Sequence, residues 1–374
     1  MKITDIEAIV VRQDKVKMIG DGSQDTVVVL VHTDEGITGI GEVDSAPEVV
    51  KAIIEAPASH MQCRGLKDIL VGEDPLNVEY LWHKMYYYSY YYTRRSVGIH
   101  AMSGIDIALW DIAGKKLGVP VSRLIGGRFR ETIPAYCSVL MPETEGEIER
   151  LVEHHKKECN YKGFKFGWGA LGKSEKRDVE LVRACRKAVG PDAKLMIDIG
   201  MAWTDYKSAL RIAKQYEKED LYWLEEPFAP DRTEDFKKLS DSMSISLASG
   251  EEFGTVYEFR DMIERGGVDI VQPDMSRCGG ITMAKKIADL AQMHGKKLIP
   301  HAFKTGILMA ATLQLIAAIP NADMLEYCAQ ETVFSKSLVR HHFRLDKDGN
   351  VAIPDLPGLG IELNTETLER YRRG

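Results

Sequence analysis

Polar side chains recur at the ends of short apolar runs through most of the second half of this 374-residue chain. Each run has the length and composition of a buried parallel strand, and a stretch of helical periodicity follows it. From Asp198 onward the polar residues return about every 25 residues, the length of one strand–helix unit. Because the carboxyl ends of parallel strands meet at one edge, we expect these side chains to form one site. They are Lys165, Asp198, Glu225, Glu251, Asp274, His301 and Glu326.

This alternation predicts an α/β fold. Eight apolar runs alternate with helical stretches from about residue 133 onward. Strict alternation favours a closed (β/α)8-type barrel over an open doubly wound sheet. The expected strands are 133–140, 163–169, 194–200, 221–227, 245–251, 268–274, 297–303 and 322–328.

The two ends of the chain have a different texture. Segments 3–12 and 26–43 indicate antiparallel strands, and a helical pattern follows them, so an α+β domain is expected over residues 1–128. Residues 340–374 return to a turn-rich β texture and are expected to pair with that domain. We therefore predict a capping domain, built from both ends of the chain, on a catalytic barrel of residues 129–339.

Composition narrows the class of protein. The chain has 49 basic and 56 acidic residues, a net charge of −7, which argues against a nucleic acid or an anionic membrane as partner. The six cysteines form no CxxC pair and indicate reduced interior thiols. The N-terminus has no secretory signal pattern, and no apolar run approaches the length of a membrane span. We expect a cytoplasmic enzyme with a small-molecule substrate.

Three of the strand-end residues are carboxylates from successive strands: Asp198, Glu225 and Glu251. An oxygen-only set without His or Cys suits Mg²⁺, or Mn²⁺, and suits Zn²⁺ poorly. Each acid alone could be a solvated loop residue, but three at matched positions favour a metal site. Glu226 and Glu252 follow two of them directly, and neighbouring strand residues point to opposite faces, so only one acid of each pair is expected to enter the site.

The remaining strand-end residues indicate acid–base chemistry. Asp274 could accept a hydrogen bond from one nitrogen of His301 and raise the basicity of the other, which is what a general base needs. Buried Lys165 could lose its proton and act as a base, or stay charged and stabilise an anion. Its alternative is an ordinary lysine whose stem is buried and whose charge reaches solvent. Glu326 could donate a hydrogen bond to a substrate oxygen.

The motifs of the chain resemble those of the enolase superfamily, mandelate racemase type, over essentially the whole length. The resemblance is carried by SGIDIALWDIAGK and LIGGR, then by KFG, MID, EEP, SGE, QPD, PHA and LEY at the strand ends, and by PGLGIEL near the C-terminus. It implies a modified barrel with an α+β cap and Mg²⁺ chemistry with a Lys or His base, as the superfamily is generally described. It also implies that Asp198, Glu225 and Glu251 are the Mg²⁺ ligands, the first glutamate of each pair being the ligand. His301 with Asp274 would be the base, and Glu326 the acid that contacts the substrate carboxylate.

One departure from the family pattern bears on the reaction. The family has Lys-x-Lys on the second strand, but here Lys165 and Phe166 are followed by Gly167. Racemisation needs a base on each face of the α-carbon, whereas one histidine can perform both steps of a syn dehydration. We therefore predict a hydro-lyase that converts a sugar acid into a 2-keto-3-deoxy acid. A racemase or epimerase of a 2-hydroxy acid, and a non-catalytic acid-sugar-binding regulatory protein, stay open as alternatives. Cycloisomerases and dipeptide epimerases are disfavoured, because the resemblance leads us to expect a lysine where this chain has Asp274.

An aromatic cluster in the first domain is left outside this scheme. It comprises Tyr80, Tyr86, Tyr87, Tyr88, Tyr90, Tyr91 and Tyr92, followed by Arg94 and Arg95. Such a density of tyrosine indicates a subunit or domain interface, so we expect a homo-oligomer. The resemblance implies that segments 18–25 and 45–60 are the loops that select the substrate.

Overall fold

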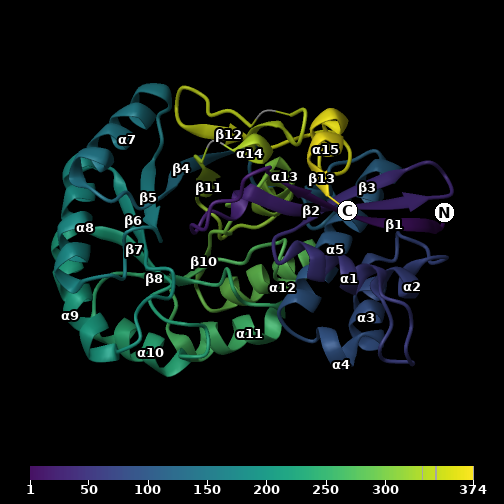
Figure 1. Ribbon diagram of the computed structural model, residues 1–374, viewed down its shortest axis with the longest axis horizontal. Helices are drawn as coiled ribbons and strands as arrows, with labels where there is room; N and C mark the ends of the chain where they lie inside the picture. Colours follow the sequence, from purple (N-terminus) through teal and green to yellow (C-terminus); the bar gives the residue numbers. More distant parts are fainter. Residues whose placement is uncertain (331, 342, 374) are drawn as a thin grey trace.

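The computed structural model describes residues 1–374 except 331, 342 and 374 (Figure 1). Strands β1 (Ile3–Arg12), β2 (Asp25–Thr33) and β3 (Thr38–Val43) form an antiparallel sheet, and β13 (Arg372–Arg373) pairs with β1 at its edge. The expected antiparallel strands are confirmed by registers such as Ile6 opposite Val31 and Leu30 opposite Ile40.

Helix α5 (Val97–Leu117) packs directly on β3. Gly39 and Gly41 of β3 face the backbone carbonyls of Ala108 and Gly104, where a β-carbon would have no room. The helix therefore lies close to the strand along much of its length, which explains why nearly all of its side chains are buried. The other helices of this part are α1 (Pro47–Glu55), α2 (Leu66–Leu70), α3 (Val78–Tyr88), α4 (Tyr90–Thr93) and α6 (Val121–Leu124), with the 3-10 turn η1 (Gly22–Gln24).

The remaining chain forms the predicted parallel β/α architecture. The hydrogen-bonded order is β10-β9-β8-β7-β6-β5-β4-β11, and every one of these pairs is parallel. The predicted class, an α/β barrel with an α+β part, is confirmed. The strands are β4 (Thr132–Leu140), β5 (Gly163–Gly167), β6 (Lys194–Asp198), β7 (Leu221–Glu225), β8 (Leu247–Ser249), β9 (Ile270–Val271), β10 (Lys297–Leu298) and β11 (Leu325–Cys328).

The helices that follow these strands form an outer layer, visible in Figure 1 as the arc from α7 through α11. They are α7 (Glu145–Glu158), α8 (Glu175–Val189), α9 (Tyr206–Tyr216), α10 (Thr233–Ser242), α11 (Thr255–Asp261), α12 (Gly280–Met293) and α13 (Gly306–Ala317), with shorter turns at η2 (Glu217–Glu219) and η3 (Met262–Gly266). None of the helices in the described part of the chain is both long and apolar enough to cross a membrane.

An apolar cluster inside the sheet supports the catalytic end of the strands. Its members are Tyr136, Met196, Trp223, Ala248, Ile270, Ile299 and Met324, all buried. Side chains two residues apart on a strand share a face, so Met196 and Trp223 lie beneath Asp198 and Glu225. These packed apolar side chains thus support the polar residues at the strand ends from inside the barrel.

The C-terminal segment returns across both parts of the molecule. Strand β12 (Asn350–Ala352) pairs with β4, while β13 pairs with β1; α14 (Val333–Ser337) and α15 (Thr365–Tyr371) complete the segment. The division at residues 128 and 339 stays our proposal.

The tyrosine cluster leaves large side chains on the surface, with Tyr91 72% exposed, and its role as an interface stays a prediction.

A buried carboxylate joins the N-terminal sheet to the barrel. Glu42 on β3 accepts hydrogen bonds from Thr26 Oγ1 at 2.8 Å, from Thr305 Oγ1 at 2.8 Å and from the Leu308 amide at 3.0 Å. Burial raises the pKa of Glu42 to about 7, despite the nearby Lys304 ammonium and these donors. The contact between the two parts is therefore sensitive to pH.

This contact predicts a specific pH dependence of stability. The unfolded chain releases the Glu42 proton near 4.5 and the folded chain near 7, so the free energy of unfolding falls as the pH rises between these values. The loss amounts to about 3 kcal/mol. Urea unfolding at both ends of this range is expected to show a smaller loss in Glu42→Gln than in the parent, whereas Glu55→Gln, an exposed control, keeps the parental slope. Equal slopes in the parent and Glu42→Gln would contradict the assignment.

Candidate active site

The structure brings the strand-end residues together around one cavity of about 270 Å³. Lys165, Asp198, Glu251, His301 and Glu326 line the cavity. Glu225 and Asp274 lie directly behind these residues, in hydrogen-bond contact with Lys165 and His301. All seven are buried, so the site is a concentration of charge in a region with little solvent.

The three predicted metal ligands lie at matched places. Asp198 and Glu225 end β6 and β7, and Glu251 follows β8 by two residues. One oxygen of each lies within 4.8 Å of the others. Burial, together with the charges of Glu225 and Glu251, raises the pKa of Asp198 well above its usual value. A divalent cation would relieve this cost, and oxygen-only donors suit Mg²⁺ or Mn²⁺. The residues therefore fit the metal.

The neighbouring hydrogen bonds hold Glu225 in place. Its Oε2 accepts from the Trp223 indole at 2.8 Å and from the Gln272 amide at 2.9 Å, and its Oε1 lies 2.5 Å from Lys165 Nζ. Glu226 turns elsewhere, accepting from Ser249 Oγ at 2.9 Å and the Gly250 amide at 2.8 Å. For this pair, only the first glutamate is directed to the metal position.

The second pair departs from the expected alternation. Both Glu251 and Glu252 line the cavity. The reason is that β8 ends at Ser249, so the pair lies in a turn where the two-residue period of a strand no longer applies. The prediction that only one of these acids enters the site is wrong.

His301 and Asp274 form a tight pair. Nδ1 of His301 lies 2.6 Å from Asp274 Oδ2, and Asp274 Oδ1 accepts from the Ser276 amide at 2.7 Å and its hydroxyl at 2.5 Å. Nε2 of His301 faces Glu251 Oε2 at 3.4 Å. Burial alone would lower the pKa of His301, but Glu251, Glu326 and Asp274 outweigh it and raise this pKa to about 10. Asp274 thus fixes the ring and leaves Nε2 toward the cavity.

Lys165 is held between two acids. Its Nζ lies 2.5 Å from Glu225 Oε1 and 2.8 Å from Glu326 Oε1. Burial disfavours the ammonium, but these carboxylates outweigh burial and raise the pKa of Lys165 well above its usual value. Lys165 is therefore a positive charge in this arrangement rather than a neutral base, and it is not a lysine that reaches solvent.

Glu326 receives donors at both oxygens. Ser138 Oγ donates to Oε1 and the Ala302 amide donates to Oε2, each at 2.7 Å. Although burial favours the protonated acid, Lys165 and His301 lower the pKa of Glu326 to about 2. In this state the carboxylate accepts at both oxygens and has no proton to donate, so the expected role of Glu326 as a donor to substrate stays a prediction that requires its protonation.

Gly167 lines the cavity at the position where the family pattern has a second lysine. Gly167 stands beside Asp198 across the β5–β6 pair, and a β-carbon there would come 2.7 Å from both Cβ and Oδ2 of Asp198. Lack of space therefore explains the glycine at position 167, because a side chain there would displace Asp198, a predicted metal ligand.

The cavity also contains Asp44, Trp168 and Arg277, which the sequence patterns did not reveal, and Ile19–Gly22, which belong to the segment 18–25 expected to select the substrate. Asp44, just after β3, lies 2.5 Å from Arg277 Nη2 and 2.5 Å from Lys304 Nζ. Lys304 also donates to the carbonyl of Gly22, and Ile19–Gly22 line the cavity together with Trp168. Arg277 lies three residues after Asp274. This closeness in sequence to a predicted site residue is the signal that could have identified Arg277 as part of the site. No residue of the expected 45–60 loop lines the cavity among those described, since Pro47–Glu55 forms helix α1.

The lack of space between Gly167 and Asp198 predicts that one added methyl group at Gly167 disturbs metal binding. Gly167→Ala is expected to displace Asp198 and weaken Mg²⁺ or Mn²⁺ binding by about tenfold or more. Isothermal titration calorimetry measures this change. Gly146→Ala is the matched control, because the nearest atom to a β-carbon there is the flexible Arg150 guanidinium at 3.4 Å. Unchanged metal affinity in Gly167→Ala would show that Asp198 does not bind the ion in this position.

Comparison with known proteins covers nearly the whole chain. Residues 6–126 match the mandelate racemase/muconate lactonizing enzyme N-terminal domain, and residues 146–367 match the enolase C-terminal domain-like family. D-galactarolactone cycloisomerase from Agrobacterium fabrum is 32% identical over 356 residues, 92% of this chain and 91% of the relative. Arabinonate dehydratase from Saccharolobus solfataricus is 31% identical over 361 residues, 96% and 93% of the two chains.

A solved structure adds the metal to this comparison. A racemase from Streptomyces coelicolor A3(2) with bound magnesium is 25% identical, with a TM-score of 0.86 and coverage of 99% of this chain and 100% of that chain. The prediction of an enzyme is confirmed by the activities of the named relatives. The argument against cycloisomerases is not supported, because one of these relatives is named as one.

Proposed function

The chain belongs to the mandelate racemase/muconate lactonizing enzyme family of the enolase superfamily, and we propose that it is a Mg²⁺-dependent sugar-acid dehydratase. In this reaction the enzyme removes the proton α to a carboxylate and eliminates the β-hydroxyl, and the product is a 2-keto-3-deoxy acid. The observation that carries the proposal is a cavity that contains His301 as a base and Gly167 where the family pattern has a second lysine.

Asp198, Glu225 and Glu251 would hold the metal. When bound, Mg²⁺ supplies a Lewis acid that neutralises the charge developing on the substrate carboxylate. Mn²⁺ could replace it with the same oxygen ligands. The racemase relative with bound magnesium supports this choice of ion.

His301 would perform both proton transfers. Its Nε2 takes the α-proton, and the electron pair of that C–H bond forms a double bond to the β-carbon as the C–O bond there breaks. The departing oxygen takes the proton back from His301 and leaves as water, and the resulting enol becomes the keto acid. Asp274 holds the ring through Nδ1 at 2.6 Å and stabilises the imidazolium between the two transfers.

Lys165 would position the reacting carboxylate, and Glu326 holds Lys165 through Oε1 at 2.8 Å. The Lys165 ammonium is buried between Glu225 and Glu326, which raise its pKa, so it suits the binding of an anion better than the removal of a proton. A base on each face is what racemisation of a 2-hydroxy acid requires. The Lys165 ammonium is held by Glu326, and Gly167 has no side chain that could act as a second base. Both features favour elimination over racemisation.

The rest of the cavity suits a hydroxylated substrate. Asp21, Asp44, Glu252 and Arg277 also line it. Alternating acids and a guanidinium can bind hydroxyl groups as donors and acceptors, while an apolar aryl group would leave them unpaired. The named dehydratase relative, which acts on arabinonate, supports the same substrate class.

A cycloisomerase is the second candidate, favoured by the relative named D-galactarolactone cycloisomerase. The same histidine could remove the α-proton while a ring oxygen, instead of a hydroxyl, leaves the β-carbon. No water is lost, because the leaving oxygen stays attached to the product. The two reactions therefore differ in the mass of the product.

A substrate screen tests the proposed function. Sugar mono- and diacids, with their lactones, are incubated with the enzyme and Mg²⁺ in D₂O and analysed by NMR and mass spectrometry. The proposal predicts loss of water, a 2-keto group and deuterium at C3. Isomerisation of a lactone without loss of water would identify a cycloisomerase, and α-deuterium exchange without elimination a racemase. Binding without any turnover would favour the regulatory alternative.

The base predicts the effect of one substitution. His301→Asn is expected to lower kcat by about a thousandfold, because the amide cannot take the α-proton. Mg²⁺ affinity, measured by calorimetry, should not fall, since the three carboxylates remain and a positive charge beside Glu251 is removed. His60→Asn, at an exposed histidine, serves as control and keeps parental activity. If His301→Asn keeps its activity, another group is the base.

A further inference from the structure

We propose that His154, His155 and Glu158, in the last turns of α7, form a second metal site for a borderline ion such as Zn²⁺. The site is independent of the proposed function. Helix α7 belongs to the outer helical layer, whereas the catalytic cavity lies at the carboxyl ends of the strands.

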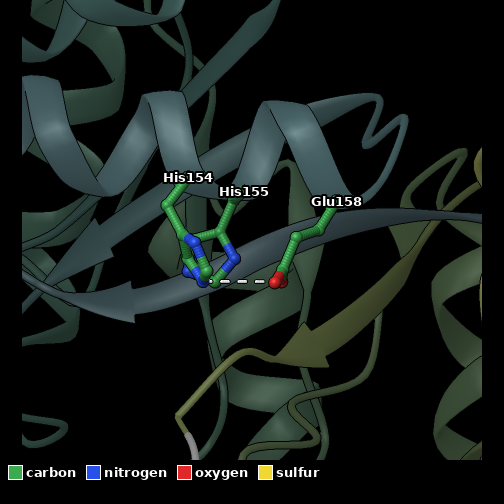
Figure 2. Close-up of side chains that lie close together, drawn as sticks. All are labelled: His154, His155 and Glu158. Carbon is green, nitrogen blue, oxygen red and sulfur yellow. Dashed lines mark ion pairs between the residues drawn. The ribbon is translucent and has the colours of Figure 1, made fainter.

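Helix geometry places the three side chains together. Residues three and four apart share a helix face, which brings His154 and His155 over Glu158. One possible ligand atom of each lies within 4.8 Å of the others, and the two imidazole rings are 5.0 Å apart. Figure 2 shows both rings and the carboxylate pointing from the helix toward one spot.

The spacing of His154 and Glu158 matches tetrahedral coordination. Zinc binds His nitrogen and carboxylate oxygen at about 2.0–2.2 Å, so two ligand atoms on one tetrahedral ion are about 3.4 Å apart. His154 Nε2 and Glu158 Oε2 are 3.4 Å apart. Two imidazoles with one carboxylate suit Zn²⁺ and related ions, in contrast to the oxygen-only set in the barrel. The chain thus offers two donor sets for two classes of ion.

The site opens onto a cavity that the proposed reaction does not use. His155 and Glu158 line a space of about 450 Å³ together with Tyr161, Tyr327 and Arg344. Three protein ligands leave one tetrahedral position open. Water or an anionic small molecule in this cavity could complete the coordination.

Zinc binding to the Mg²⁺-saturated full-length protein tests the proposal. Excess Mg²⁺ occupies the barrel carboxylates, and calorimetry with ZnCl₂ then reports the second site, with Co²⁺ absorption as a check on tetrahedral geometry. One equivalent of Zn²⁺ is expected per chain. His154→Ala and Glu158→Gln should each weaken binding by at least about tenfold. Both residues are more than half exposed, so thermal unfolding is expected to stay parental without zinc.

Three controls separate the site from other ligands. His294→Ala removes a histidine that has one carboxylate beside it, Glu264 at 3.8 Å, and is expected to keep full affinity. Cys159→Ser removes the adjacent thiol, and Asp198→Asn removes a barrel carboxylate; both should also keep it. Absence of zinc binding, equal affinity in the His154→Ala/Glu158→Gln double variant, or loss of binding in Cys159→Ser alone would each overturn the proposal.

Discussion

Repulsion among buried carboxylates is the constraint on which the site depends. Asp198, Glu225, Glu251, Asp274 and Glu326 lie almost without solvent at one end of the barrel. Lys165 and His301 each contact two of these carboxylates, and Arg277 contacts Glu251. This arrangement accounts for the protonation pattern: the pKa of Asp198 is raised, that of Glu326 is lowered and that of His301 is raised. A divalent cation at the three-carboxylate position would redistribute all of these charges together.

The fold provides the rigidity that this concentration of charge requires. Each acidic side chain stands at or just beyond a strand end, above the buried apolar cluster that contains Trp223. Trp223 also donates a hydrogen bond to Glu225, so the apolar cluster is directly connected to the site. On the open side, the N-terminal part closes the cavity through Asp44, which is held by Arg277 and Lys304. The same cap contact covers the site and places polar groups where a hydroxylated substrate would lie.

Much of this arrangement could be predicted from the sequence, because it follows from local periodicity. The apolar runs indicated the strands, and parallel order then placed the residues that end them at one edge. Contacts that depend on side-chain direction outside regular elements could not be predicted in this way. Glu252 enters the cavity because a turn replaces the strand, and Asp44 reaches Arg277 across 233 residues of chain. The charge state of Lys165 could not be predicted from the sequence either. It depends on the two carboxylates that contact the ammonium, Glu225 at 2.5 Å and Glu326 at 2.8 Å.

The central claim is that the metal and the base act as one electrostatic unit. Glu251 is the largest of the charges that raise the pKa of His301, and it is also a proposed metal ligand. Binding of Mg²⁺ should therefore free His301 to act as a base near neutral pH. Histidine-selective NMR titration, with His301→Asn to assign the resonance, measures this directly. The account predicts that the pKa of His301 falls from about 10 toward its ordinary 6.5 when Mg²⁺ saturates the protein. A value that stays near 10 at saturating Mg²⁺ would contradict it.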